Sequence, residues 1–232
     1  DFDSGNIKER KPVSFESPVK GNSTLCYWAL AWSEQGGFIE EHPHKGFEII
    51  SYVIEGGIEH KDSTSDEWVS LKTGDMQVIR AGNGVTHAER FLPGTRMFQI
   101  WLDPDFRRSL QRPASYSDYE AADFETEEKN GMQLTDFLGD ESPAYLGTSV
   151  RMERYDFGVG NYAISLESGH VLTAVVIQGS VQVDDHVLEQ GDLVQIKNRG
   201  ELAFQSSAEG AIFVLVNPVS AGYRTYNDQL QL

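Results

Sequence analysis

Side chains that bind divalent metals occur in two short clusters of this sequence. His42 and His44 flank a proline, and His87 and Glu89 flank an alanine. In a β-strand, residues two apart point to the same face, so each cluster can present two ligands in parallel. Three imidazoles and one carboxylate suit a borderline metal and leave positions for water or substrate. The clusters therefore predict a site for one Fe(II), Mn(II), Ni(II) or Cu(II) ion.

A second carboxylate, Glu48, competes with Glu89 for a place in this site. Glu48 has the same parity as His42 and His44, and it would face the same interior if the strand ran unbroken. Proline cannot donate to a strand ladder, so Pro43 places the first pair at a strand start or edge. The remaining histidines stand alone and are expected to be structural or solvated: His60, His170 and His186.

The elements that position these residues are expected to be short strands. The 22 glycines and 8 prolines favour a turn-rich β protein over a helical bundle. Turn sequences such as 56–57 and 82–84 separate apolar runs of strand length. These runs cover residues 25–32, 47–54, 76–79, 96–102, 161–166, 171–177, 193–196 and 211–216. The sequence therefore predicts an all-β protein built as a sandwich or barrel.

Composition excludes several classes of protein. The 232 residues fit one large or two small domains, because domains usually have ~100–150 residues. The net charge of −17 disfavours direct contact with nucleic acid and anionic lipid. No apolar run approaches the ~18 residues that cross a bilayer. The single cysteine, Cys26, offers neither an internal disulfide nor a thiolate zinc site, so we expect a cytoplasmic protein.

The two halves of the chain resemble each other. Residues 48–79 and 171–196 both read as strand, glycine, strand, loop, Gly-Asp and strand. Aligning Gly56 with Gly179 gives an offset of 123, and aligning Gly74 with Gly191 gives 117. Under these offsets, His42, His44, His87 and Glu89 fall on Ser165, Glu167, Phe204 and Ser206. Two copies of one β unit are the simplest account, and only the first is expected to bind metal.

The metal-ligand clusters lie in motifs of a known family. Residues 37–56 resemble the first cupin motif and residues 74–89 resemble the second. More narrowly, His-Pro-His-Lys-Gly-Phe-Glu at 42–48 and Ala-Gly-Asn-Gly-Val-Thr-His-Ala-Glu at 81–89 are similar to the pirin branch. The resemblance implies two cupin barrels (double-stranded β-helix or jelly-roll) in tandem. We expect a metal-binding barrel over 1–114, an acidic connecting segment over 115–143 and a degenerate barrel without metal ligands over 144–232.

The resemblance also implies a metal, its ligands and two alternative functions. His42, His44, His87 and Glu89 would bind one ion, Fe(II) first, with Mn, Ni, Cu or Zn as alternatives. One function is a dioxygenase for quercetin-like flavonols, with Glu89 or Glu48 as the catalytic proton acceptor. The alternative is a non-enzymatic, redox-sensing regulator that binds a protein partner. A third hypothesis, a metal-free cupin isomerase or sugar-processing enzyme, would use the histidines as acid and base.

Overall fold

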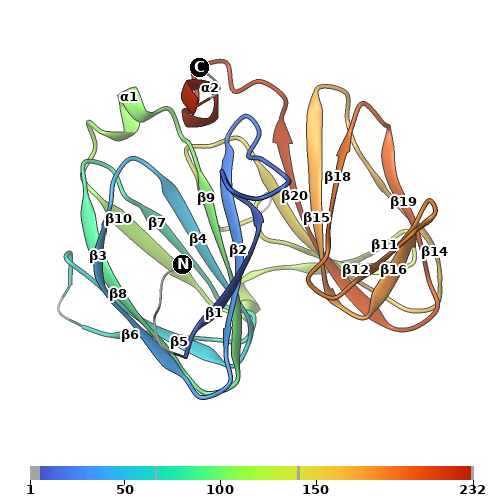
Figure 1. Cartoon of the computed structure of the whole chain (residues 1–232), viewed down its shortest axis with the longest axis horizontal. Coiled ribbons are helices and arrows are strands. Elements are labelled where there is room, and N and C mark those ends of the chain that lie inside the picture. Colours follow the sequence, from blue (N-terminus) through green and yellow to red (C-terminus); the bar gives the residue numbers. More distant parts are fainter. Residues whose placement is uncertain (1–5, 66, 140–141, 231–232) are drawn as a thin grey trace. The chain divides into compact units, whose positions relative to one another are not determined.

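A computed structural model describes residues 6–65, 67–139 and 142–230. Its strands fall into two groups, each made of a six-stranded and a four-stranded antiparallel sheet (Figure 1). The prediction of an all-β protein is thereby confirmed. The helices are short: α1 (Phe106–Ser109), the 3-10 helix η1 (Ala121–Asp123) and α2 (Tyr226–Leu230).

The first group forms unit 1. Its six-stranded sheet contains, in spatial order, β1 (Lys8–Val13), β2 (Leu25–Ser33), β9 (Thr95–Leu102), β4 (Glu48–Glu55), β7 (Met76–Arg80) and β10 (Ser115–Tyr119). Its four-stranded sheet contains β3 (Gly37–His44), β8 (Val85–Phe91), β5 (Gly57–Asp62) and β6 (Val69–Lys72). Two apolar clusters of buried residues lie in this unit, one around Val53 and Phe91 and one around Ile49 and Ile79.

The second group forms unit 2. Its six-stranded sheet contains, in spatial order, β11 (Thr126–Lys129), β12 (Met132–Asp136), β13 (Arg151–Phe157), β20 (Gly210–Pro218), β15 (His170–Gln178) and β18 (Leu193–Lys197). Its four-stranded sheet contains β14 (Gly160–Ser165), β19 (Glu201–Ser206), β16 (Ser180–Val183) and β17 (His186–Glu189). One large apolar cluster draws side chains from both sheets of this unit.

The predicted internal repeat is present in the sheet topology. The order β2-β9-β4-β7 in unit 1 corresponds to β13-β20-β15-β18 in unit 2, and β3-β8-β5-β6 corresponds to β14-β19-β16-β17. The aligned glycines share a backbone conformation that favours glycine, since φ is 76° at Gly56 and 73° at Gly179. The Gly-Asp turns also match: the Asp75 and Asp192 carboxylates each accept from a backbone N–H three residues upstream, at 2.9 Å.

The boundaries of the units differ from the expected ones. Unit 1 contains residues 1–121, 146–148 and 222–232, and unit 2 contains 122–145 and 149–221. The segment 115–143, expected to be a connection, supplies β10 to unit 1 and β11 and β12 to unit 2. Its acidic side chains do not prevent this, because the four residues of the edge strand β11 are exposed while Met132 and Leu134 of β12 are buried.

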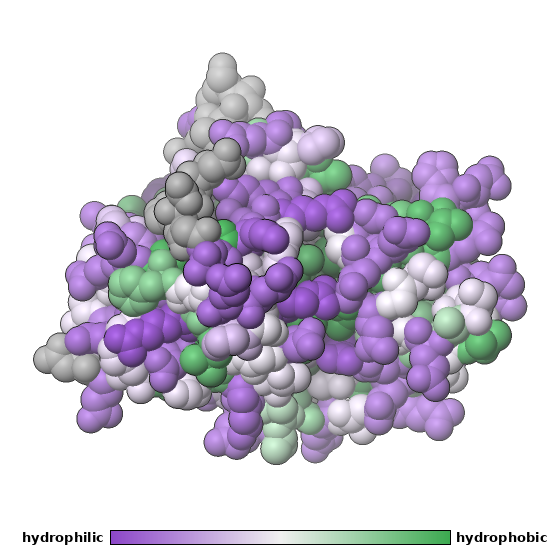
Figure 2. Space-filling model, turned by 60° about the horizontal axis from the view of Figure 1, so that its bottom comes forward, coloured by the Kyte–Doolittle hydropathy of each residue, from purple (hydrophilic) through white to green (hydrophobic). Residues whose placement is uncertain are grey.

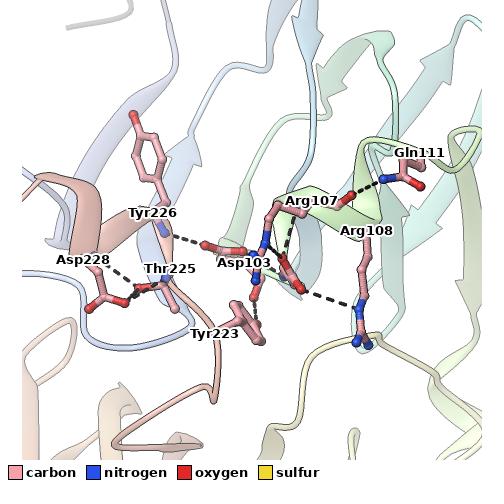
Figure 3. Close-up of polar contacts among 9 residues, drawn as sticks. Asp103, Arg107, Arg108, Gln111, Tyr223, Thr225, Tyr226 and Asp228 are labelled. Atoms are coloured by element: carbon pink, nitrogen blue, oxygen red, sulfur yellow. Dashed lines mark hydrogen bonds and ion pairs between the residues drawn. The ribbon is translucent and has the colours of Figure 1, made fainter.

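The C-terminal segment belongs to unit 1 and is bound there by Asp103, which follows β9 (Figure 3). The Asp103 carboxylate accepts a hydrogen bond from the backbone N–H of Tyr226, at 2.5 Å. The Tyr223 hydroxyl donates to the Asp103 carbonyl. Tyr226 also packs edge-on against Phe47, with ring centroids 5.5 Å apart. These contacts fix residues that follow unit 2 in the chain to unit 1.

The surface is consistent with the strong net charge. On the face shown in Figure 2, hydrophilic residues predominate and hydrophobic ones form small separate groups. Within the described ranges, no helix has the length and apolar character that a membrane span requires.

Candidate metal centre

Three histidines of unit 1 converge at the pairing of β3 with β8. Antiparallel pairing places His42 directly opposite His87, and His44 follows two residues along β3. One ring nitrogen from each of His42, His44 and His87 lies within 4.8 Å of the others. The Nε2 atoms of His42 and His87 are 2.9 Å apart. The structure thus brings together the three histidines singled out in the sequence.

Two buried polar atoms at this position show that the residues suit a metal. His44 Nε2 and Glu89 Oε1 have no hydrogen-bond partner among the described residues. A buried polar atom without a partner costs about 1–3 kcal/mol, so natural structures rarely leave one unexplained. Both atoms carry lone pairs, as a metal ligand must. Glu89 is two residues beyond His87 on β8 but lies outside the three-histidine group.

Burial keeps the imidazoles of His44 and His87 in the form that binds metals. Desolvation, reinforced by neighbouring histidines, lowers the pKa of His44 to about 4 and that of His87 to about 2. Both rings are therefore neutral at pH 7 and keep a free lone pair. Burial has the opposite effect on Glu89 and raises its pKa to about 7, although a hydrogen bond from Gln99 opposes this shift.

A cavity of about 520 Å³ opens onto this group within unit 1. His42, His44 and Glu89 contribute to its lining. Most of the remaining wall is apolar or aromatic, including Tyr27, Phe47, Phe91, Met97 and Trp101. A concave apolar site with a few convergent polar groups is the usual form of a small-molecule site.

The structure does not bring Glu48 to this site. The chain turns between β3 and β4 at Gly46, which has φ = 86°, so the parity that linked Glu48 to the histidines is lost. The Glu48 carboxylate instead accepts hydrogen bonds from the backbone N–H groups of Gly147 and Thr148 and from the Thr148 hydroxyl. Glu48 binds a segment of unit 1 that is distant in sequence.

Two residues beside the ligand candidates escaped the sequence analysis. His60, expected to stand alone, pairs with Glu89 across β5 and β8, and its Nε2 lies 3.1 Å from His87 Nδ1. Gln99 on β9 donates from Nε2 to Glu89 Oε2 at 3.2 Å. The parity of His60 with the apolar Ile58 was the available signal for an inward position. By contrast, His170 is half-buried and His186 is exposed, both in unit 2.

Unit 2 has different residues at the positions that correspond to the four ligand candidates of unit 1. In unit 1, Glu59 pairs with Arg90. The residue of unit 2 that corresponds to Glu59 is Gln182, and it pairs with Gln205. Arg90 therefore corresponds to Gln205, so the offset between β8 and β19 is 115 rather than 117. A bulge in β3 between Ile39 and His42 shifts the alignment of β3 with β14 by one residue, so His42 and His44 no longer correspond to Ser165 and Glu167. The equivalents of His42, His44, His87 and Glu89 are therefore Ile164, Leu166, Leu202 and Phe204.

All four of these equivalents are buried in the apolar core of unit 2. The alignment made on sequence alone, which paired them with Ser165, Glu167, Phe204 and Ser206, was wrong in register. Its conclusion that the second copy lacks the imidazoles holds. Since the fold packs well with apolar side chains here, the polar set of unit 1 is not needed to form the fold.

Comparisons with known proteins agree with this geometry. The family model for pirin matches residues 14–102, which include the three histidines and Glu89. A Pseudomonas aeruginosa protein provisionally named a quercetin 2,3-dioxygenase is 30% identical over 186 residues, which are 78% of this chain and 77% of that protein. A quercetin 2,3-dioxygenase structure from Acinetobacter baumannii is 25% identical, with a TM-score of 0.73 over 85% of this chain and 76% of that one.

A second solved structure extends the match over nearly the whole chain. The bacterial pirin YhhW of Escherichia coli, solved in complex with nickel(II), has a TM-score of 0.75 at 21% identity, and the match covers 92% of this chain and 93% of that one. This likeness confirms the fold of two tandem cupin barrels. Together with the motifs and the three-histidine group, these matches show that the chain belongs to the pirin family.

Proposed function

We propose that the protein is a metal-dependent dioxygenase that acts on a quercetin-like flavonol. One observation carries the proposal: three imidazoles converge beside a cavity with aromatic walls, and one of them has a buried nitrogen without a partner in the described chain. The names of the Pseudomonas and Acinetobacter relatives support this choice of substrate class.

The proposed cofactor is one divalent ion, with Fe(II) or Ni(II) preferred. His42, His44 and His87 would hold it, and Glu89 would be the fourth ligand. Imidazole suits both metals, and the nickel complex of the E. coli pirin supports the second. When bound, such an ion supplies Lewis-acid chemistry that lowers the pKa of a substrate hydroxyl and prepares the ring for dioxygen.

The side chains of the cavity would orient a planar substrate and exclude water. The Trp101 ring packs against Tyr27, with centroids 4.7 Å apart, and against Phe47 at 5.5 Å. This aromatic wall offers flat faces on which a flavonol can stack. Glu89 is the candidate proton acceptor, because its buried carboxyl group lines the cavity beside the histidines.

The test combines metal analysis with turnover. Purified protein is reloaded separately with Fe(II), Ni(II), Cu(II) and Mn(II), and quercetin absorbance is followed with and without oxygen. We expect about one ion per chain and oxygen-dependent loss of absorbance, both of which His87→Ala removes and the unit 2 control His170→Ala retains.

A protein that binds one ion yet turns over no flavonol with any of the four metals would refute the dioxygenase proposal. That result would support the metal-dependent regulator instead. Activity that survives in His87→Ala would refute the assignment of the site.

A further inference from the structure

Two of the four ligand candidates, His87 and Glu89, also have a defined partner on the side that faces away from the other ligand candidates. His87 has two ring nitrogens: Nε2 lies 2.9 Å from His42 Nε2, and Nδ1 lies 3.1 Å from His60 Nε2. Glu89 has two oxygens: Oε2 accepts from Gln99, and Oε1 has no partner among the described residues. In Glu89, one oxygen is thus engaged and the other is available to a metal. In His87, Nδ1 contacts His60 while Nε2 faces a second ligand candidate, His42.

We propose that His60 and Gln99 are positioning residues of the metal centre, which set the orientation of His87 and Glu89. The inference rests on the metal site of the proposed function but not on its reaction. It names contacts outside the set of four ligand candidates.

The His60 contact determines which nitrogen of His87 can bind. A metal ligand needs a lone pair, so if Nε2 faces the metal, the proton of the neutral ring must be on Nδ1. That Nδ1–H then donates to His60 Nε2, which must be unprotonated. His60 is 1% exposed, so water does not readily replace it as the acceptor. Partners of this kind hold the ring and tautomer of a ligating histidine.

The Gln99 contact has its direction set by a third residue. The indole Nε1–H of Trp101 can only donate, and it donates to Gln99 Oε1 at 3.1 Å. The amide of Gln99 must therefore present its NH₂ group to Glu89 Oε2. Glu89 is held by one oxygen while Oε1 remains available, and the indole that fixes this arrangement also lines the cavity.

Unit 2 shows that neither positioning residue is required by the fold. The strand register that relates the two units places Val183 at the position of His60 and Val214 at that of Gln99. Both valines are buried in the apolar core of unit 2. The polar pair is therefore present where the metal ligands are present and absent where they are absent.

The experiment measures metal affinity, not turnover. Nickel(II) binding is followed by calorimetry at fixed pH for the wild type and for two variants, His60→Val and Gln99→Val. Each variant introduces the residue that unit 2 has at the equivalent position. We expect the Kd to rise about 10- to 100-fold in each variant, the usual effect of losing such a partner. His60→Gln restores an acceptor oxygen and should recover part of the affinity. The control His186→Val changes an exposed histidine of unit 2 and should leave the Kd unchanged.

Two further readouts separate positioning from general damage. The Co(II) absorption bands report ligand geometry and should change in His60→Val and Gln99→Val. The thermal midpoint of the metal-free protein should not fall, because apolar residues occupy these positions in unit 2.

Unchanged nickel affinity and cobalt bands in both valine variants would overturn the proposal. So would a loss of affinity that only accompanies a lower midpoint without metal and that His60→Gln does not recover. Failure of flavonol turnover with these metal results intact would refute only the proposed reaction.

Discussion

Replacing a ligand histidine by the residue found at the equivalent position of unit 2 should make the protein more stable than the wild type without metal and less stable than the wild type with metal. His44→Leu places leucine where unit 2 has the buried Leu166. His44 is 9% exposed, and its Nε2 has no partner among the described residues. The variant removes an unsatisfied buried atom, worth about 1–3 kcal/mol, and buries a side chain worth about 1.5–3 kcal/mol.

Losses reduce this gain but should not cancel it. The His44 ring packs edge-on against Trp101, with centroids 5.0 Å apart, and a leucine side chain has a different shape. Such shape changes in a core usually cost about 1–3 kcal/mol. We therefore expect the metal-free variant to be more stable than the wild type by about 2 kcal/mol. This corresponds to a rise in Tm of roughly 4 °C per kcal/mol for a unit of this size.

With bound metal, the wild type should be more stable than His44→Leu. A ligand at about 1,000 times its Kd stabilises the folded state by about 4 kcal/mol, and His44→Leu should lose most of that contribution. All four tryptophans lie in unit 1, so fluorescence melts with chelator and with excess nickel(II) report on this unit: Trp28, Trp32, Trp68 and Trp101. A variant that melts below the wild type both with chelator and with nickel would refute the reasoning, because the histidine would then be supporting the fold.

Three further outcomes follow from contacts of unit 1 away from the histidines. The buried Ser51 hydroxyl has no partner within the described chain, so Ser51→Ala should raise the free energy of unfolding by about 1 kcal/mol, which fluorescence melts would record as a higher Tm. A lower Tm would show that a water satisfies the hydroxyl. Glu48→Gln replaces one acceptor oxygen by an amide NH₂, which then faces the N–H group of either Gly147 or Thr148, so denaturant unfolding should show a loss of about 1–3 kcal/mol. An unchanged midpoint would contradict this role. Burial raises the pKa of Asp103 above 3.8, so the folded state holds this proton more tightly than the unfolded state, and the carboxyl's contribution to stability declines as pH rises through the folded pKa. The advantage of the wild type over Asp103→Asn in melts should therefore shrink as the pH rises above 3.8, and an advantage that grows with pH would contradict the sign of this linkage.

Much of the site could be predicted because its signals are local. The alternation of side chains along a strand placed His42 with His44 and His87 with Glu89, and the histidine part of this grouping is seen in the structure. Glycines in matching positions marked the turns of both repeats, so the internal duplication was also visible in the sequence. The structure shows that these glycines have positive φ. These features depend only on residues near each other in the chain.

The features that the sequence could not supply depend on which strands meet. A turn at Gly46 separated Glu48 from the histidines, and the pairing of β5 with β8 brought His60 to His87. The acidic segment contributes β10 to the sheet edge of unit 1 and β11 and β12 to the sheet edge of unit 2. Local periodicity determines which way a side chain can point, whereas register across hydrogen-bonded strands determines what it meets, and register is a property of the whole sheet.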